Sequence, residues 1–151
     1  MARHRAREQA LQMLFQWDLR RTASETPELE DILKGYYGSL MISEDTPDPE
    51  GRDSFAESLL RGVVAEVAAI DGIIARHASN WKIPRMPAVD RNVLRLGVYE
   101  MMRTDTPPAV AIDEGLELVR RFSGEESVHF VNGVLDAVKR ELTAATSAPA
   151  E

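Results

Sequence analysis

Apolar residues recur along most of the chain at the three- and four-residue spacing that is typical of amphipathic helices. The first segment shows this pattern clearly, because an arginine and three glutamines occupy the face opposite its apolar stripe. A helix is therefore predicted close to the N-terminus. Its apolar stripe consists of Ala6, Ala10, Met13, Leu14 and Trp17.

A second helix is predicted to open at Thr26, because Pro27 would then take the first helical position, where its missing N–H costs nothing. Apolar residues continue at helical spacing from Leu29 to Leu40. Residues 43–51 (SEDTPDPEG) contain two prolines, a glycine and four acids, and this composition predicts an exposed loop within the domain.

The stretch from Asp53 to Ile74 keeps a helical apolar period for about six turns, which predicts the longest helix of the protein. Residues 82–87 (KIPRMP) interrupt the pattern with two prolines. The segment from Val89 to Met102 is apolar on most sides, so we expect its helix to lie at the centre of the fold.

Two more helices are predicted towards the C-terminus. The first runs from Pro108 to a turn at Gly124, and the second continues to Leu142 from a capping box formed by Ser123 and Glu126. No convincing alternating strand pattern is present. We therefore expect an all-α, compact helical bundle over residues 1–142, built as two helical subdomains, and a disordered tail over residues 143–151.

Composition indicates one ordinary globular domain. The chain has 151 residues and no cysteine, and no segment has the eighteen or so consecutive apolar residues of a membrane span. The N-terminus also lacks the apolar core of a signal peptide. A cytoplasmic protein without disulfides and without a membrane partner is expected.

Charge is distributed unevenly along the chain. The net charge of −7 argues against a nucleic-acid partner, because phosphate binding rests largely on lysine and arginine. However, residues 1–21 carry five arginines against two acids, whereas residues 22–58 carry two basic residues against ten acids. This asymmetry indicates a charged partner more strongly than the total does.

Candidate catalytic and metal-binding groups are few. The three histidines, at positions 4, 77 and 129, have unrelated spacings, and no nucleophile elbow or glycine-rich phosphate loop is present. Asp113, Glu114 and Glu117 could act as acids or bases, but on an amphipathic helix they are more typical of a solvated face. We expect no catalytic residues, no metal and no cofactor.

Two places are suited to RNA. Arg3, Arg5 and Arg7 could bind phosphates or stack on bases, although a solvated helix start explains them at least as well from composition alone. Phe130 lies at the margin of its helix's apolar stripe. It is therefore either part of the core or a flat ring on which a base could stack.

Four blocks of the sequence together carry a resemblance to a known family. The blocks ARHRAREQALQMLFQWDL, VDRNVLRLGVYEMM, PPAVAIDEGLELVRRF and HFVNGVLDAV resemble the NusB family of transcription antitermination factors, in the family's order and at its spacing. The resemblance covers nearly the whole chain. It implies an all-α protein of two three-helix subdomains that binds the single-stranded boxA element of ribosomal RNA leaders and is not an enzyme.

The resemblance also implies the residues that contact RNA. Arg3, Arg5 and Arg7 match the family's arginine-rich motif, and Phe130 matches an RNA-contacting aromatic residue. Two basic positions are histidines here, which are mostly neutral at pH 7, and this lowers the charge available to phosphates. The implied RNA-binding residues are Arg3, His4, Arg5, Arg7, Glu126, His129 and Phe130.

The family acts with NusE, a ribosomal protein of the small subunit, and the heterodimer loads onto boxA RNA to help build an antitermination complex on RNA polymerase. The resemblance places the NusE surface near Phe15 and Asp90. Phe15 could instead belong to a second buried stripe with Leu11 and Leu19, and Asp90 could simply be a helix-start charge. A homodimer is left open.

Two other functions stay in view. A similar helical domain begins some ribosomal RNA cytosine methyltransferases, but only a short tail follows Leu142, and we expect no catalytic domain there. The chain could also be a protein-interaction module that binds NusE without RNA affinity of its own. Binding to a boxA-like oligonucleotide, with and without the partner, distinguishes these functions.

Overall fold

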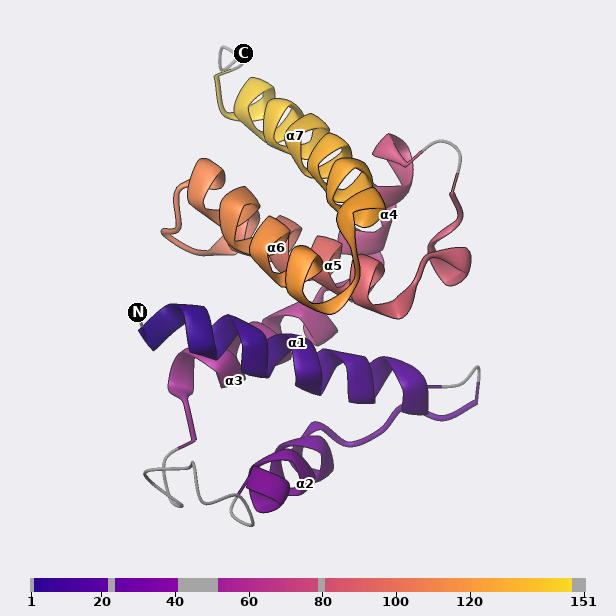
Figure 1. The fold of residues 1–151 in the computed structure, drawn as a ribbon, viewed down its shortest axis with the longest axis vertical. Helices are drawn as coiled ribbons and strands as arrows, with labels where there is room; N and C mark the ends of the chain where they lie inside the picture. The colour runs from indigo at the N-terminus through magenta and orange to yellow at the C-terminus, as the bar shows by residue number, and fades with distance from the viewer. Residues whose placement is uncertain (1, 22–23, 41–51, 79–80, 148–151) are drawn as a thin grey trace. The chain divides into compact units, whose positions relative to one another are not determined.

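The computed structural model describes residues 2–21, 24–40, 52–78 and 81–147, and it divides the chain into two compact units, residues 1–62 and 63–151. Its described residues form seven α-helices and no strand, which confirms the all-α prediction (Figure 1). The first unit contains α1 (Ala2–Arg20), α2 (Leu29–Leu40) and most of α3 (Ser54–Ala65). The second contains α4 (Val67–His77), a 3₁₀ turn η1 (Ile83–Arg85), α5 (Ala88–Arg103), α6 (Pro108–Phe122) and α7 (Glu125–Ser147).

The core of the first unit is built on α1. All five residues of the predicted apolar stripe are buried, and α2 packs against this helix. Tyr36 of α2 donates a hydrogen bond to Gln12 Oε1, and burial raises the pKa of Tyr36 to about 12. Helix α2 begins at Leu29 rather than Thr26, because the Glu28 carbonyl is the first acceptor, receiving the N–H groups of Asp31 and Ile32.

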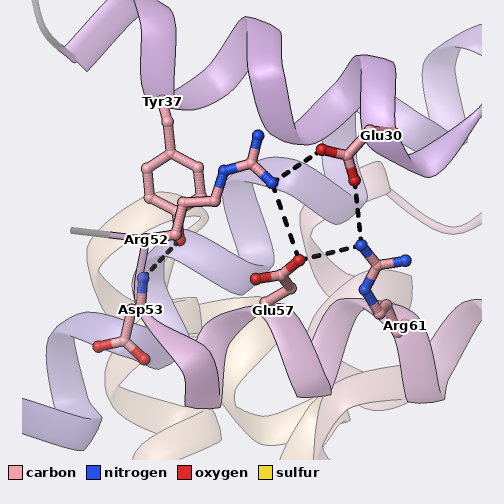
Figure 2. A network of polar contacts seen from close by, with 6 residues as sticks. All are labelled: Glu30, Tyr37, Arg52, Asp53, Glu57 and Arg61. Atoms are coloured by element: carbon pink, nitrogen blue, oxygen red, sulfur yellow. Dashed lines mark hydrogen bonds and ion pairs between the residues drawn. The ribbon is translucent and has the colours of Figure 1, made fainter. Parts of the chain in front are cut away.

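A group of acids and arginines joins α2 to the start of α3 (Figure 2). Glu30 of α2 accepts hydrogen bonds from Arg52 at 2.8 Å and from Arg61 at 3.2 Å, and Arg61 also reaches Glu57 at 2.9 Å. The hydrogen bond from Arg52 is the main reason that the pKa of Glu30 lies below its ordinary value. Exposed pairs of this kind contribute little stability singly, so the network adds only modestly to the packing of the two helices.

The beginning of α3 is capped locally. Asp53 Oδ1 accepts the N–H of Ala56 at 2.9 Å, which satisfies one of the free donors of the first turn. The Asp53 N–H in turn donates to the Tyr37 hydroxyl at 3.1 Å (Figure 2). The loop predicted at residues 43–51 lies outside the described residues.

The long helix predicted from Asp53 to Ile74 is wrong. The structure divides it into α3 and α4 at Glu66, whose backbone has φ −113° and ψ 18°. The Glu66 N–H bonds to the Val63 carbonyl, one residue short of the α-helical pattern, and the Glu66 carboxylate is held by Arg103 of α5 at 2.7 Å. The helix break at Glu66 is therefore accompanied by an ion pair with another helix, and no proline or glycine at Glu66 indicates it in the sequence.

Helix α5 is the centre of the second unit, as the sequence predicts, and it packs against α4, α6 and α7 (Figure 1). Its buried polar groups find partners. The Arg95 guanidinium donates to both carboxylate oxygens of Asp71 on α4, at 2.8 and 2.9 Å, and to Asn92 Oδ1 at 2.9 Å. An almost fully covered cation is thereby satisfied on three of its nitrogens.

The C-terminal elements differ from expectation in two respects. Helix α7 is the longest helix described and continues to Ser147, so residues 143–147 are helical and only 148–151 lie outside the described residues. The predicted capping box does not form. Ser123 instead shares a hydrogen bond with the Ser127 hydroxyl at 2.9 Å, and the Gly124 carbonyl accepts the Val128 N–H at the start of α7.

Removing the partner of the buried guanidinium should destabilise the protein. We expect Asp71→Ala to lower the free energy of unfolding by about 3 kcal/mol, because Arg95 would stay buried without its carboxylate. The matched control is Glu117→Ala, which removes a carboxylate from an exposed pair with Arg120 and should change stability little. Urea unfolding of both variants tests this, and equal losses would contradict it.

A pair of glycines offers a packing test. A Cβ on Gly97 of α5 would lie 2.9 Å from Leu135 Cδ2 of α7, whereas a Cβ on Gly72 of α4 would meet nothing within 4 Å. Both substitutions replace glycine, which has a low helix propensity, by alanine, which has a high one, but only the substitution at Gly97 crowds the core. Gly97→Ala should therefore be less stable than Gly72→Ala by about 1–3 kcal/mol in thermal unfolding. Equal stabilisation by both would refute the crowding argument.

Candidate nucleic-acid and partner interfaces

The arginine-rich start of α1 lies against an aromatic ring of the same unit. Arg3 places its guanidinium carbon 4.4 Å from the centre of the Phe55 ring, and that of Arg7 lies 5.6 Å away. Guanidinium groups at these distances are attracted to the negative face of the ring. Phe55 thus gathers two of the predicted RNA-binding arginines at one place on α3.

The predicted RNA contacts on α1 differ in accessibility. Arg3 and Arg5 are exposed and His4 is half-buried, but Arg7 is only 5% exposed. A side chain so covered has little surface to offer a ligand. Arg7 is therefore better suited to holding Phe55 and the first turn of α1 than to contacting RNA, which departs from the assignment by resemblance.

The other predicted RNA contacts lie at the start of α7. Glu126 and His129 are exposed, and Phe130 is half-buried, so this ring is neither a core residue nor fully in solvent. The Phe130 ring makes an edge-to-face contact with Trp81, with 6.2 Å between ring centres and 61° between planes. Sequence periodicity missed Trp81, because it precedes η1 in a segment without a helical pattern.

A pocket of about 190 Å³ opens beside these two rings. Asp90 of α5 lines it and is 3% exposed. Its Oδ2 accepts a hydrogen bond from Ser127 at 2.8 Å, whereas its Oδ1 is buried and has no hydrogen-bond partner among the described residues. The lining residues are Trp81, Met86, Pro87, Asp90, Glu126, Ser127 and Phe130.

The predicted partner residues have opposite environments. Phe15 of α1 is 37% exposed and Leu19, one turn later, is more exposed still, while Leu11 is buried. The alternative of a second buried stripe through all three residues is therefore wrong. Asp90 does lie in the first turn of its helix, but its burial leaves it little surface for a protein partner.

The structure thus brings Asp90, Glu126 and Phe130 together around one pocket of the second unit, whereas Phe15 and the arginines belong to α1 of the first unit. Within the described ranges, no three histidines or acids gather as a metal site would require. No helix in the part of the chain that the structure describes is long and apolar enough to cross a membrane. Asp113 and Glu117 are exposed, as expected for a solvated face.

Comparison with known proteins identifies the family of the chain. The chain matches the NusB family over residues 4–140. It is 52% identical to the transcription antitermination protein NusB of Solibacter usitatus (strain Ellin6076), over 99% of this chain and 96% of that protein. It is 42% identical to the corresponding protein of Saccharopolyspora erythraea, over 91% of this chain and 86% of that one.

Solved structures agree with this match. T. maritima NusB superposes with a TM-score of 0.74 at 35% identity, covering 92% of this chain and 91% of that one. A crystal structure of the antitermination factors NusB and NusE in complex with double-stranded RNA gives a TM-score of 0.73 at 31% identity, covering 93% of this chain and 99% of that one. The fold is that of a helical transcription antitermination factor, and the chain belongs to the NusB family.

Proposed function

We propose that this protein binds the single-stranded boxA element of ribosomal RNA leaders together with NusE, as one component of an antitermination complex on RNA polymerase. The related complex of NusB and NusE with double-stranded RNA supports NusE and RNA as the two kinds of partner. The function is one of binding, without catalysis, and transcription of ribosomal RNA places it in the cytoplasm.

The observation that carries the RNA-binding proposal is the placement of arginines at the start of α1. Cations are unfavourable at a helix N-terminus, and α1 has no acid in its first turn to offset them. The exposed guanidinium groups and the positive end of the helix dipole both attract anions. The arginines at the start of α1 therefore lower the stability of the helix, and they are well placed to bind the phosphate groups of RNA.

The contacts of the second unit would complement these charges with an aromatic surface. Phe130 offers a partly exposed ring to an unpaired base, beside Glu126 and His129 at the start of α7. Arg7 would act through Phe55, positioning the first turn of α1. The proposed RNA contacts are therefore Arg3 and Arg5 on α1 and, separately, the residues at the start of α7.

Neutralising the exposed arginines should weaken RNA binding and its salt dependence. We expect Arg3→Ala with Arg5→Ala to make the slope of log affinity against log salt shallower by about 1.4, because two phosphate contacts on a single strand would be lost. The control, Arg20→Ala with Arg140→Ala, removes two other exposed arginines. Its net charge is therefore the same as that of the first double variant. Fluorescence anisotropy of labelled boxA RNA, with NusE present, measures both.

The control pair should leave the slope unchanged. If both pairs have the same effect, binding follows net charge and not the arginines of α1. If the unmodified protein fails to bind boxA RNA with NusE present, the chain is better described as a protein-interaction module. The net charge of −7 and the burial of Arg7 are the observations that favour this second function.

The partner surface is proposed to centre on Phe15. This ring is exposed on α1, and a second apolar side chain, Leu19, follows it one turn later on the same face. Two exposed apolar residues at this spacing form the kind of anchor that a partner can bury. Asp90 is covered, so it would reach a partner only through the pocket beside Phe130.

Truncating Phe15 should weaken NusE binding without unfolding the protein. We expect Phe15→Ala to lower the affinity at least about fivefold, the effect of losing roughly 1 kcal/mol at an interface anchor. Phe122→Ala is a matched control, because Phe122 on α6 is also 37% exposed. Isothermal titration with NusE and thermal unfolding give the two readouts. If Phe15→Ala lowers the melting temperature so far that unfolding explains the lost binding, Phe15 belongs to the core instead.

A further inference from the structure

Trp81 is the most unusual exposed side chain of the second unit. Its indole is 52% exposed, although large aromatic side chains are normally well covered. The ring is held against Phe130 and forms one wall of the 190 Å³ pocket. Such a pocket is smaller than those that take drug-sized molecules, and it fits a single planar ring or one side chain.

The polar groups of the pocket are acceptors. Asp90 and Glu126 contribute carboxylates, and the Ser127 hydroxyl donates its hydrogen to Asp90 Oδ2. Asp90 Oδ1 is the buried oxygen without a partner. Leaving such an atom unpaired is costly, so a ligand that donates a hydrogen bond to it would be favoured.

The same carboxylates exclude phosphate from the pocket itself. Basic residues lie next to it along the chain, with Lys82 following Trp81 and Arg85 in η1, and both are exposed. A strand whose phosphates meet these cations could turn one base towards the aromatic wall. The charges therefore suit a nucleotide whose base, and not its phosphate, enters the pocket.

We propose that this pocket takes one unpaired RNA base that stacks on Trp81, and that it prefers a base with an exocyclic amino group. Adenine, cytosine and guanine can donate an exocyclic amino hydrogen to the Asp90 carboxylate. Uracil has no amino group, and its single donor, the N3–H, lies between two carbonyl oxygens that a carboxylate repels. The inference rests on the proposed RNA binding and adds Trp81 and Asp90 to it, as a stacking residue and a residue that selects the base.

Trp81 provides its own reporter for the test. The other tryptophan, Trp17, is 1% exposed, so quenching of tryptophan fluorescence by boxA RNA should come from Trp81. We expect Trp81→Ala to weaken RNA binding, measured by anisotropy with NusE present, about 5- to 150-fold, as for the loss of one base stack. Trp81→Phe keeps a stacking ring and should recover much of the affinity, while Phe122→Ala should have no effect.

Base preference is tested with oligonucleotides of adenine, cytosine or uracil, ten nucleotides long. Adenine and cytosine oligomers should quench Trp81 at lower concentration than the uracil oligomer. Asp90→Asn keeps the shape of the side chain but replaces one acceptor by a donor, and it should reduce this difference. Equal quenching by all three oligomers, or an unchanged preference in Asp90→Asn, would overturn the selection of amino-bearing bases.

The outcomes separate this inference from the proposed function. If Trp81→Ala binds boxA RNA as tightly as the unmodified protein, the pocket takes no base, and RNA binding through Arg3 and Arg5 still stands. If NusE alone quenches Trp81, the pocket is occupied by a protein side chain and the inference is wrong. If the unmodified protein binds no RNA, the proposed function and this inference fail together.

Discussion

The second unit depends on burying α5 from several sides at once, and this is feasible only because its polar side chains are paired. A guanidinium removed from water without partners would be far too costly to keep inside a helical bundle. Arg95 avoids this cost through Asp71 on α4 and through Asn92 one turn earlier on its own helix. The ion pair therefore fixes α4 against α5.

The position of α5 has consequences for the interface at its beginning. Asp90 lies in the first turn of this helix, and Ser127 at the start of α7 donates to it. The pocket beside Phe130 is thus built where two helix starts meet, each held by packing along the rest of its length. Packing along α5 keeps the Asp90 carboxylate covered and holds it in a fixed direction. A fixed carboxylate of this kind suits the recognition of a small planar ligand.

The first unit obtains its charged surface in a different way. Arginines at the start of α1 oppose the helix dipole, and the ring of Phe55 on α3 compensates part of this cost by facing two of them. The ion pairs of Glu30 with Arg52 and Arg61 hold α2 to α3 and so support the helix that carries the ring (Figure 2). Charge, and not apolar burial alone, therefore organises the first unit.

The sequence by itself determined the helices with a continuous apolar stripe, the central place of α5 and the all-α class, because periodicity reports directly which faces avoid water. It also identified Phe130 and the arginines as candidates, since their chemistry is visible in any conformation. It could not reveal the break at Glu66, which a residue from another helix accompanies, nor the end of α7.

Only the tertiary structure decided which candidates are accessible. Arg7 and Arg3 have the same chemistry, yet one is covered and the other exposed, and Asp90 is a helix-start acid that packing encloses. Trp81 belongs to no periodic pattern, and it becomes a candidate only through its contact with the ring of Phe130, 49 positions further along the chain. Burial and juxtaposition are properties of pairs of distant residues, and a local pattern carries no information about them.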